Sequence, residues 1–421
     1  MHQVRRVAML SLHTSPLDQP GGGDAGGMNV YVQALALELA AAGVAVEIFT
    51  RRTSPSQPDV VDMAPGVLVH HITAGLPEKV SKETLPTLVP QMADAVTAII
   101  GSRTVDTVDV IHSHYWVSGM AGMLVAAALN LPLVHTMHTM ARVKNRNLAP
   151  GQSAEPGIRE DGEQHIVAAA TRLIANTTAE AAELERHYNG CERRIDVVSP
   201  GVDLKVYKPA FRDRSRQRLG IAATDFHVVF AGRLQRLKGP HVIVRAAAIL
   251  RRERPDIPLR VSILGARSGS DKYDIDHFIE AESLADTVRV MAPVTAEVLA
   301  DWYRSADVVT MPSATESFGL VAIEAQACGT PVIATNVGGL PRAVSDGRTG
   351  LLVDGRTPRL WAEAIASLYD FPQTRTDMGR AASVYAEAFG WEHTALLTMS
   401  SYDLALAGRR TIPAANYPKS A

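Results

Sequence analysis

The sequence predicts an α/β protein made of two doubly wound, Rossmann-like domains that face a central cleft. Short runs of Val, Ile and Leu alternate with longer stretches of helical periodicity almost throughout the chain, which is the pattern of βαβ units that build parallel sheets. The runs are apolar at nearly every position, as in strands buried on both faces. The 421 residues suit two to three domains of about 150 residues each, and the alternation is interrupted once. We therefore expect two sheets in succession.

The first series of expected strands ends near residue 198. Its members lie at 7–12, 44–50, 67–72, 110–112, 133–135, 172–175 and 195–198, with helices that include 28–42 and 178–189. The segment SPGVDLKVYKP at 199–209 then breaks the alternation with Pro and charged residues, as a linker does. This predicts an N-terminal domain over residues 1–205.

The second series opens with an Arg-rich helix at 211–219. Strands are expected at 227–231, 259–264, 288–291, 308–311, 332–335 and 351–353, and helices at 240–252, 296–306, 319–327 and 358–369. These elements predict a C-terminal domain over 206–390. Helices follow at about 374–389 and 391–407; we expect the last to pack back on the N-terminal domain, and residues 408–421 to form a loose tail.

Composition excludes several classes of protein. The 42 Lys and Arg against 44 Asp and Glu give a net charge of −2, so no general attraction to nucleic acid or anionic membrane is expected. No apolar stretch reaches the length of a membrane span, and the run at 7–12 is too short for a signal peptide. Cys191 and Cys328 are too few for a disulfide framework. We expect a cytoplasmic enzyme.

A glycine-rich segment follows the first strand. The stretch HTSPLDQPGGGDAGGMNVYV at 13–32 leads into a helix, where glycines and free backbone amides can receive an anion. Asn29 adds a carboxamide that can pair with a hydroxyl or phosphate. A flexible glycine turn remains an equally good interpretation of this segment, because its spacing is not that of a nucleotide fingerprint.

Histidines stand at the ends of two neighbouring strands, in HSHYW at 112–116 and HTMHT at 135–139. Such a set could suggest zinc. No carboxylate or thiolate completes a set of ligands, however, so imidazoles that hydrogen-bond a ligand or the backbone are the preferred interpretation.

The strongest chemical signal lies in the second half. AGRLQRLKG at 231–239 places Arg233 and Lys238 on one loop between a strand and a helix, where both can bind a diphosphate. A solvated basic loop is the alternative. The segment at 312–332 decides between them, because Gly319 begins a helix whose amides can bind phosphate and Glu316 and Glu324 flank that apolar helix start.

These residues resemble the retaining glycosyltransferases of family 4, whose second domain carries GR…KG and an E-x7-E pattern. Within that family, the segment at 13–32 together with VSKETLP, HSHYW, HTMHTMARVKN and EPGIREDGEQ is similar to the enzymes that glycosylate inositol phosphate in mycothiol biosynthesis. The similarity extends from about residue 7 to 406. It implies a GT-B fold and the transfer of N-acetylglucosamine from UDP-N-acetylglucosamine to 1D-myo-inositol 3-phosphate, with retention of the α configuration.

The resemblance also implies site residues. Those for the acceptor are His13, Asp24, Ala25, Gly26, Gly27, Met28, Asn29, Lys82, Tyr115, Thr139 and Arg159. Those for the donor are Gln19, Pro20, Gly27, Arg233, Lys238, Val294, Glu316 and Glu324, and the catalytic set is Glu316, His138, Arg233 and Lys238. A magnesium ion held mainly by carbonyls maps to Tyr303, Arg304, Ala306 and Thr330. The family further implies a homodimer and no organic cofactor.

The chain departs from the family pattern at two positions, since members often carry Pro in place of Arg236 and Arg in place of Val294. The alternatives to the function above are a family 4 enzyme with another acceptor, such as a sugar phosphate, and a GT-B nucleotide-sugar epimerase. A regulator that binds nucleotide sugars without catalysis is disfavoured by the combination of Arg233, Lys238 and Glu316.

Overall fold

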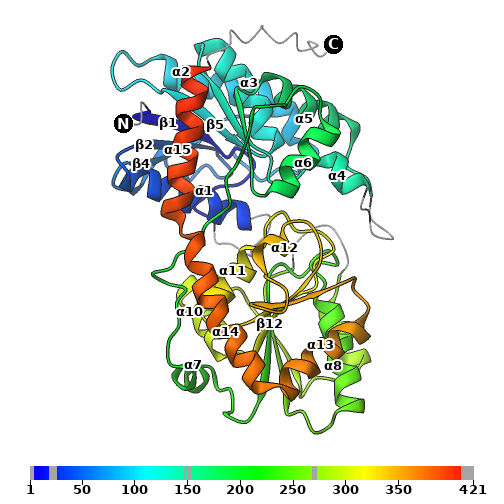
Figure 1. Ribbon diagram of the computed structural model, residues 1–421. Helices are drawn as coiled ribbons and strands as arrows, with labels where there is room; N and C mark the ends of the chain where they lie inside the picture. The colour runs from blue at the N-terminus through cyan, green and yellow to red at the C-terminus, as the bar shows by residue number, and fades with distance from the viewer. Residues whose placement is uncertain (1–3, 19–25, 147, 149–152, 268–272, 409–421) are drawn as a thin grey trace. The chain divides into compact units, whose positions relative to one another are not determined.

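The computed structural model describes residues 4–18, 26–146, 148, 153–267 and 273–408, and they divide into two compact units (Figure 1). Within those limits, unit 1 holds residues 4–18, 28–199 and 394–408, and unit 2 holds 26–27 and 200–393. The chain therefore changes unit at Ser199, a few residues before the expected boundary. It changes back at His393, inside its last helix.

Unit 1 is built on one sheet of eight strands in the order β3-β4-β2-β1-β5-β6-β7-β8. The strands are β1 (Arg6–Leu10), β2 (Ala45–Arg51), β3 (Val60–Ala64), β4 (Val67–Ile72), β5 (Val110–His114), β6 (Leu133–Thr136), β7 (Arg172–Ala175) and β8 (Ile195–Val197). All neighbours are parallel except β3 and β4. Because β1 lies between β2 and β5, the order reverses there, and ligands of such sheets bind at the carboxyl ends of the strands beside this point.

The edge strand β3 is absent from the strands expected from sequence. Its five residues VVDMA are exposed or half-buried, so they lack the continuous apolar run that marked the other strands. A tight turn at Gly66, with φ at +82°, pairs β3 antiparallel with β4. An antiparallel edge strand needs only one buried face, which explains why its pattern is weaker.

Helices cover both sides of the first sheet (Figure 1). They are α1 (Gly27–Ala41), α2 (Val89–Gly101), α3 (Trp116–Leu129), α4 (Ala141–Arg146), α5 (Gly157–Ala169) and α6 (Thr178–His187), with a 3₁₀ turn at Leu85–Leu88. The last helix, α15 (Trp391–Ala407), joins them from Thr394 onward. The Thr394 hydroxyl donates to the Ser199 carbonyl at 2.9 Å, and Tyr402 is fully buried. The C-terminal helix thus completes the core of unit 1.

Unit 2 contains a parallel sheet of six strands in the order β11-β10-β9-β12-β13-β14. They are β9 (Phe226–Ala231), β10 (Leu259–Leu264), β11 (Val288–Met291), β12 (Val308–Met311), β13 (Val332–Thr335) and β14 (Gly350–Val353). The order reverses between β9 and β12, which pair directly. The loops that follow these two strands carry the two expected donor segments, so the topology brings them to one edge of the sheet.

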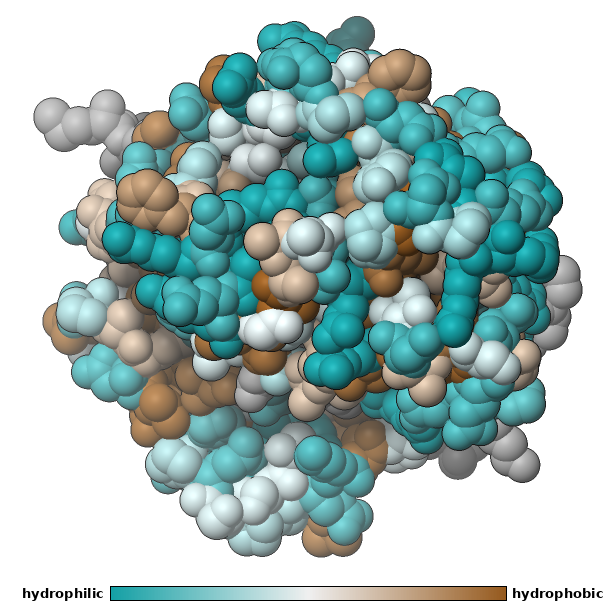
Figure 2. Space-filling view, turned by 90° about the horizontal axis from the view of Figure 1, so that it is seen from below, coloured by the Kyte–Doolittle hydropathy of each residue, from teal (hydrophilic) through white to brown (hydrophobic). Residues whose placement is uncertain are grey.

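The helices of unit 2 enclose an apolar core on each face of this sheet. They are α7 (Arg212–Leu219), α8 (Pro240–Glu253), α9 (Ile275–Ala281), α10 (Ala296–Ser305), α11 (Leu320–Ala327), α12 (Leu340–Ala343), α13 (Pro358–Asp370) and α14 (Pro372–Ala386), followed by a 3₁₀ turn at Glu387–Phe389. Seen from below, the surface is mostly hydrophilic, with apolar residues in small groups (Figure 2). Among the described residues, no helix is long and apolar enough to cross a membrane.

Candidate active site

The loop after β1 is held in place by the first turn of α1. Asn29 is buried, and its amide nitrogen donates to the Thr14 hydroxyl at 2.8 Å and to the Ser15 carbonyl at 2.6 Å. The Ser11 hydroxyl donates to the Thr14 carbonyl at 2.8 Å. The amide group of Asn29 therefore positions the loop that carries His13, in addition to any contact that it makes with a ligand.

Four of the expected acceptor residues gather around one aromatic ring. The rings of His13 and Tyr115 lie 4.4 Å apart, and the guanidinium of Arg159 lies 5.0 Å from the Tyr115 centroid. Arg159 also donates to the carbonyl and hydroxyl oxygens of Thr139, at 3.1 and 2.9 Å. These residues come from the loops after β1, β5 and β6 and from α5, so parallel-sheet topology alone brings the first three loops together.

Arg159 carries its own counter-charges. It is 1% exposed, its Nε donates to Glu163 at 2.8 Å, and a second guanidinium nitrogen lies 2.9 Å from Glu155. Burial by itself would raise the pKa of Glu155, but Arg159 and Lys144 hold it below its usual value. The cation is therefore neutralised locally. The spacing of four residues between Glu155, Arg159 and Glu163 was visible in the sequence and would have predicted these pairs.

Lys82 lies on the exposed loop between β4 and α2. The start of that loop is organised by a residue that the sequence did not single out. Arg51 is buried at the end of β2 and donates to the carbonyls of Ala74, Leu76 and Glu78. A long-range bond of this kind, from an arginine in one strand to the loop after another, has no local sequence signature.

Two histidines after β5 and β6 form a hydrogen-bonded pair. Nδ1 of His114 lies 3.0 Å from Nε2 of His138, and the Tyr31 ring meets the His138 ring edge-on at 5.1 Å. His138 has a φ of +59°, a conformation that is uncommon for a residue other than glycine. Burial, with His135 and His13 close by, lowers the pKa of His138, so the partly exposed ring is a neutral hydrogen-bonding group at pH 7.

The other two histidines of these motifs are buried polar groups with partners inside the chain. His112 bonds the Tyr402 hydroxyl at 2.7 Å and the Thr136 hydroxyl at 2.9 Å. His135 bonds the Ser113 hydroxyl at 2.8 Å through Nδ1, and its Nε2 lies 3.1 Å from the Met137 sulfur. Each ring therefore satisfies its buried nitrogens without a ligand, and His112 ties α15 to the sheet of unit 1.

In unit 2, the two expected donor segments are joined by an ion pair. Lys238 Nζ lies 2.6 Å from Glu316 Oε2, and the Ser313 hydroxyl donates to the same oxygen at 3.2 Å. The two side chains are 24% and 16% exposed, so the pair faces a surface that a ligand can reach. A backbone bond of 2.7 Å from Ala314 to the Leu237 carbonyl also joins the segments.

Glycines allow the close backbone approach around this pair. Gly239 has a φ of +73°, and a Cβ there would lie 2.3 Å from the Pro312 carbonyl oxygen. Gly338 has a φ of +53°, and a Cβ there would lie 2.1 Å from the Glu316 carbonyl oxygen. Larger residues at either position would displace the loops that hold Lys238 and Glu316.

The start of α11 offers backbone amides beside the same loop. Its N-cap is Gly319, with a φ of +104°, so the residue before the helix has no side chain to bond the first amides. Further along the helix, Glu324 is 8% exposed and accepts a hydrogen bond of 3.0 Å from the Tyr303 hydroxyl. Burial raises the pKa of Glu324 to about 7, and the Tyr303 bond opposes this rise. The sequence did not signal the contribution of the Tyr303 hydroxyl.

Arg233 is half-buried in the loop after β9 and forms no ion pair with a carboxylate of the described residues. A Cβ on Gly26 would lie 3.7 Å from its Nε, and both residues belong to unit 2. The end of the glycine-rich segment thus lies beside the expected donor cation. An unneutralised guanidinium is suited to receive a diphosphate.

The remaining expected residues are dispersed. Val294 is half-buried before α10, and Met28 is half-buried in α1. Gln19, Pro20, Asp24 and Ala25 lie outside the described residues. The expected magnesium residues meet near the end of α10, where the Tyr303 carbonyl accepts from the Thr330 hydroxyl at 2.7 Å and from the Ala306 amide at 3.1 Å.

Comparisons with known proteins identify the family. The model of glycosyltransferase family 4 matches residues 25–206, and that of glycosyl transferases group 1 matches residues 211–384. A D-inositol 3-phosphate glycosyltransferase of Arthrobacter sp. strain FB24 is 59% identical over 406 residues, which are 96% of each chain. One of Streptomyces scabiei is 49% identical over 96% of this chain and 92% of its own. The chain belongs to the D-inositol 3-phosphate glycosyltransferase family.

Solved structures agree with the architecture of a D-inositol 3-phosphate glycosyltransferase. Sucrose-phosphate synthase of Thermosynechococcus elongatus gives a TM-score of 0.86 at 32% identity, over 94% of this chain and 98% of its own. Anabaena HepE in complex with UDP-glucose gives 0.72 at 19% identity, over 94% and 98%, and this likeness bears on the fold alone. The chain is a glycosyltransferase with the GT-B fold, as the sequence predicted.

Proposed function

We propose that this enzyme transfers N-acetylglucosamine from UDP-N-acetylglucosamine to 1D-myo-inositol 3-phosphate with retention, as the first step of mycothiol biosynthesis. The observation that carries the proposal is the identity of 59% over 96% of the chain to a relative named for D-inositol 3-phosphate. The local geometry supports it, because unit 1 presents cationic and hydroxyl groups suited to a phosphorylated polyol and unit 2 presents groups suited to a nucleoside diphosphate.

The donor half of the reaction is assigned to unit 2. Arg233 and Lys238 stabilise the negative charge that grows on the departing UDP, and the amides at the start of α11 add the favourable end of a helix dipole. Glu316 orients the donor sugar and, through its bond of 2.6 Å, the Lys238 ammonium. Glu324 accepts hydrogen bonds from the ribose hydroxyls. Arg233, Lys238 and Glu316 are supported on loops at the carboxyl edge of the sheet, and Glu324 lies further along α11, which begins at that edge.

The acceptor half is assigned to unit 1. Lys82 and Arg159 bind the inositol phosphate, while Tyr115 and Thr139 bond its oxygens. Because Glu155 already lies 2.9 Å from Arg159, the phosphate and this carboxylate compete for one guanidinium. Acceptor binding therefore shifts Glu155 toward Lys144, with which it also forms an ion pair. We assign His138 to the donor sugar as a neutral hydrogen-bonding group, held by His114.

Retention is assigned to a front-face displacement. The acceptor hydroxyl oxygen bonds the anomeric carbon on the face from which the diphosphate oxygen departs, and the hydroxyl proton passes to that departing oxygen. This route needs no covalent nucleophile, unlike the double displacement of retaining glycosidases. The role of the protein is then to position both substrates and to stabilise the growing charge.

We further propose a magnesium ion at Tyr303, Arg304, Ala306 and Thr330. The donors are carbonyl and hydroxyl oxygens, which suit this hard cation. The Tyr303 carbonyl and the Thr330 hydroxyl would hold the ion together, and in its absence the hydroxyl donates to the carbonyl at 2.7 Å. When bound, the ion would fix the end of α10 against the segment before β13. The test is a rise in melting temperature with magnesium that is lost in Thr330→Val.

We also propose that the enzyme works in the cytoplasm as a homodimer and that nucleic acid and membrane are not partners. Both cysteines are buried thiols without a disulfide, which suits a reducing compartment. Light scattering of the purified protein checks the dimer.

The decisive experiment is product analysis after incubation with UDP-N-acetylglucosamine and a panel of acceptors. The panel holds the isomers of inositol monophosphate and fructose 6-phosphate, since a structural relative is named for a sugar phosphate. We expect one α-linked product, from 1D-myo-inositol 3-phosphate. Product from the sugar phosphate alone would identify a different acceptor, and UDP release without any acceptor would indicate the epimerase alternative.

A further inference from the structure

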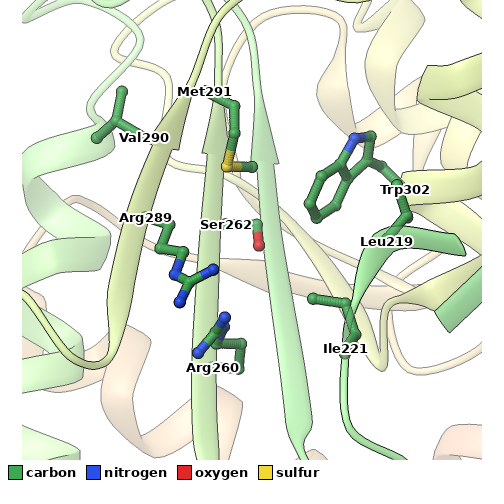
Figure 3. Close-up of a pocket in the computed structure, with 8 residues that line it drawn as sticks. All are labelled: Leu219, Ile221, Arg260, Ser262, Arg289, Val290, Met291 and Trp302. Atoms are coloured by element: carbon green, nitrogen blue, oxygen red, sulfur yellow. The ribbon is translucent and has the colours of Figure 1, made fainter. Parts of the chain in front are cut away.

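A pocket lies in unit 2 on the face of the sheet that α10 covers, toward its β10–β11 edge. It has a volume of about 350 Å³ and is lined by Leu219, Ile221, Arg260, Ser262, Arg289, Val290, Met291 and Trp302 (Figure 3). None of these residues belongs to the donor or acceptor sets described above. The volume falls within the range of small-molecule sites.

Two arginines stand side by side at one end of this pocket (Figure 3). Arg289 of β11 pairs in register with Ser262 of β10, and Arg260 lies two residues before Ser262, so all three share one face of the sheet. No acidic side chain of the described residues forms an ion pair with either arginine, and Nε of Arg260 is buried without a hydrogen-bond partner. Arg260 is half-buried and Arg289 is exposed, and two adjacent cations without carboxylate partners favour an anion between them.

A hydroxyl group lies between the arginines and the apolar wall. The Ser305 hydroxyl donates to the Trp302 carbonyl at 2.7 Å, so it accepts from Nδ1 of His227 at 3.1 Å. Nε2 of His227 is then an acceptor, and the Ser262 hydroxyl donates a hydrogen bond to it at 2.9 Å. Burial lowers the pKa of His227 to about 3, which keeps the ring neutral at pH 7, and the bond to Ser305 selects the tautomer. Ser262 therefore offers lone pairs to the pocket.

The rest of the lining is largely apolar. Trp302 of α10 and Ile221 present an indole ring and a branched chain, and Met291, two residues after Arg289 on β11, presents a thioether (Figure 3). Trp302 is only 9% exposed and Ile221 6%, so these side chains are fixed by packing around them. A flat or ring-shaped ligand body would gain contact area here without requiring the wall to reorder.

We propose that this pocket binds a small organic anion, in which a phosphate or carboxylate meets Arg260 and Arg289 and an aromatic ring lies against Trp302. A donor group on the ligand would bond Ser262. Charge-assisted bonds to paired guanidiniums supply most of the specificity, because planar, forked donors match these anions. Free phosphate or carboxylate alone lacks the ring and binds more weakly.

The position of the pocket links it to the donor site of the proposed function. Trp302 in the pocket wall is followed directly by Tyr303, whose hydroxyl bonds Glu324 at 3.0 Å. Ser305, on the same helix, takes part in the chain of bonds to Ser262. Any displacement of α10 by the ligand would therefore move Tyr303, whose hydroxyl holds Glu324. We infer that occupancy of the pocket changes the affinity for UDP, and linkage makes this effect reciprocal.

The binding test uses the full-length enzyme with UDP and 1D-myo-inositol 3-phosphate at saturation, so that both substrate sites are filled. Calorimetric titration with phenyl phosphate and with phenylacetate should show saturable binding of at least one probe. We expect Arg260→Ala and Arg289→Ala each to weaken this binding by about tenfold or more. Arg348→Ala is the matched control, since it removes an exposed arginine of unit 2 outside the pocket, and it should bind like the wild type.

The site would be overturned by no saturable binding of either probe, by equal binding of a probe to Arg289→Ala and wild type, or by binding of inorganic phosphate as tight as that of phenyl phosphate. Loss in Arg348→Ala as well would indicate a general charge effect and would also refute it. Circular dichroism and melting curves of each variant confirm that it is folded.

The coupling is measured separately, as the Kd of UDP without and with saturating phenyl phosphate. We expect a change of about fivefold or more in wild type and none in Arg289→Ala. An unchanged Kd in wild type would overturn the coupling. If the wild-type enzyme did not bind UDP at all, the proposed donor site would be overturned. The titration with phenyl phosphate and phenylacetate would still decide whether the pocket binds an anion.

Discussion

The buried carboxyl of Glu324 should make the stability of the free enzyme depend on pH. Glu324 is 8% exposed and burial raises its pKa from 4.5 to about 7. The carboxyl of the unfolded chain ionises first as pH rises, so the folded state loses stability between pH 4.5 and 7. Glu324→Gln removes this ionisation and keeps an oxygen that can accept the Tyr303 hydroxyl.

The magnitude follows from the two pKa values. The difference between 4.5 and about 7 corresponds to a loss of about 3.4 kcal/mol in the free energy of unfolding, at about 1.36 kcal/mol per pKa unit. The whole of this loss has occurred above pH 8. At pH 5 less than about 1 kcal/mol of the free energy of unfolding has been lost. Burying the glutamine amide has a cost of its own, but that cost is independent of pH. The variant should therefore gain about 2.6 kcal/mol relative to wild type between pH 5 and pH 8.5.

The assay is denaturant unfolding of wild type, Glu324→Gln and the exposed control Glu363→Gln at both pH values, without UDP. A gain of this size corresponds to roughly 5–10 °C in the melting temperature of a domain of this length. In kinetics, Glu324→Gln should lower kcat/KM for the donor by about ten- to a hundredfold, through weaker bonds to the ribose. The reasoning would be refuted if the difference in the free energy of unfolding between Glu324→Gln and wild type were the same at both pH values.

Further predictions concern the two substrates. Arg233→Ala should lower kcat by about a hundredfold, because a guanidinium that stabilises departing UDP acts in the transition state; normal steady-state kinetics would remove this assignment. Lys82→Ala should raise the KM for inositol phosphate by about tenfold, and an unchanged KM would remove Lys82 from the acceptor site. His114→Phe should lower kcat by about tenfold by releasing His138 from their hydrogen bond; an unaltered kcat would show that His138 needs no support.

Much of the fold follows from local patterns. Continuous apolar runs mark strands buried on both faces, and all the strands of unit 2 were expected close to their observed bounds. The strand β3 was not predicted, because its residues are exposed or half-buried and form no continuous apolar run. The change of unit at Ser199 falls at the first residue of the segment 199–209, before the expected boundary at 205, since a linker signal marks composition and not the last contact with the core.

The candidate site was predictable as sets of residues attached to particular strands. The loops after β9 and β12 could be placed together because neighbouring parallel strands end at one edge of a sheet, and Lys238 and Glu316 do meet there. The state of each group was not predictable. Arg159 is already neutralised by Glu155 and Glu163, and His138 is bonded to His114.

The sequence alone determined the two-sheet architecture and which loops carry chemistry, because periodicity and topology act over short stretches of chain. The tertiary structure decided which groups are paired, which are buried and which remain unneutralised. Burial in the surrounding core raises the pKa of Glu324 to about 7, and the hydrogen bond from the Tyr303 hydroxyl opposes this rise. Arg260 and Arg289 form a candidate anion site because two strands bring them together on one face where no described carboxylate pairs with them. Such properties depend on neighbours in space, and residues far apart in the chain supply them.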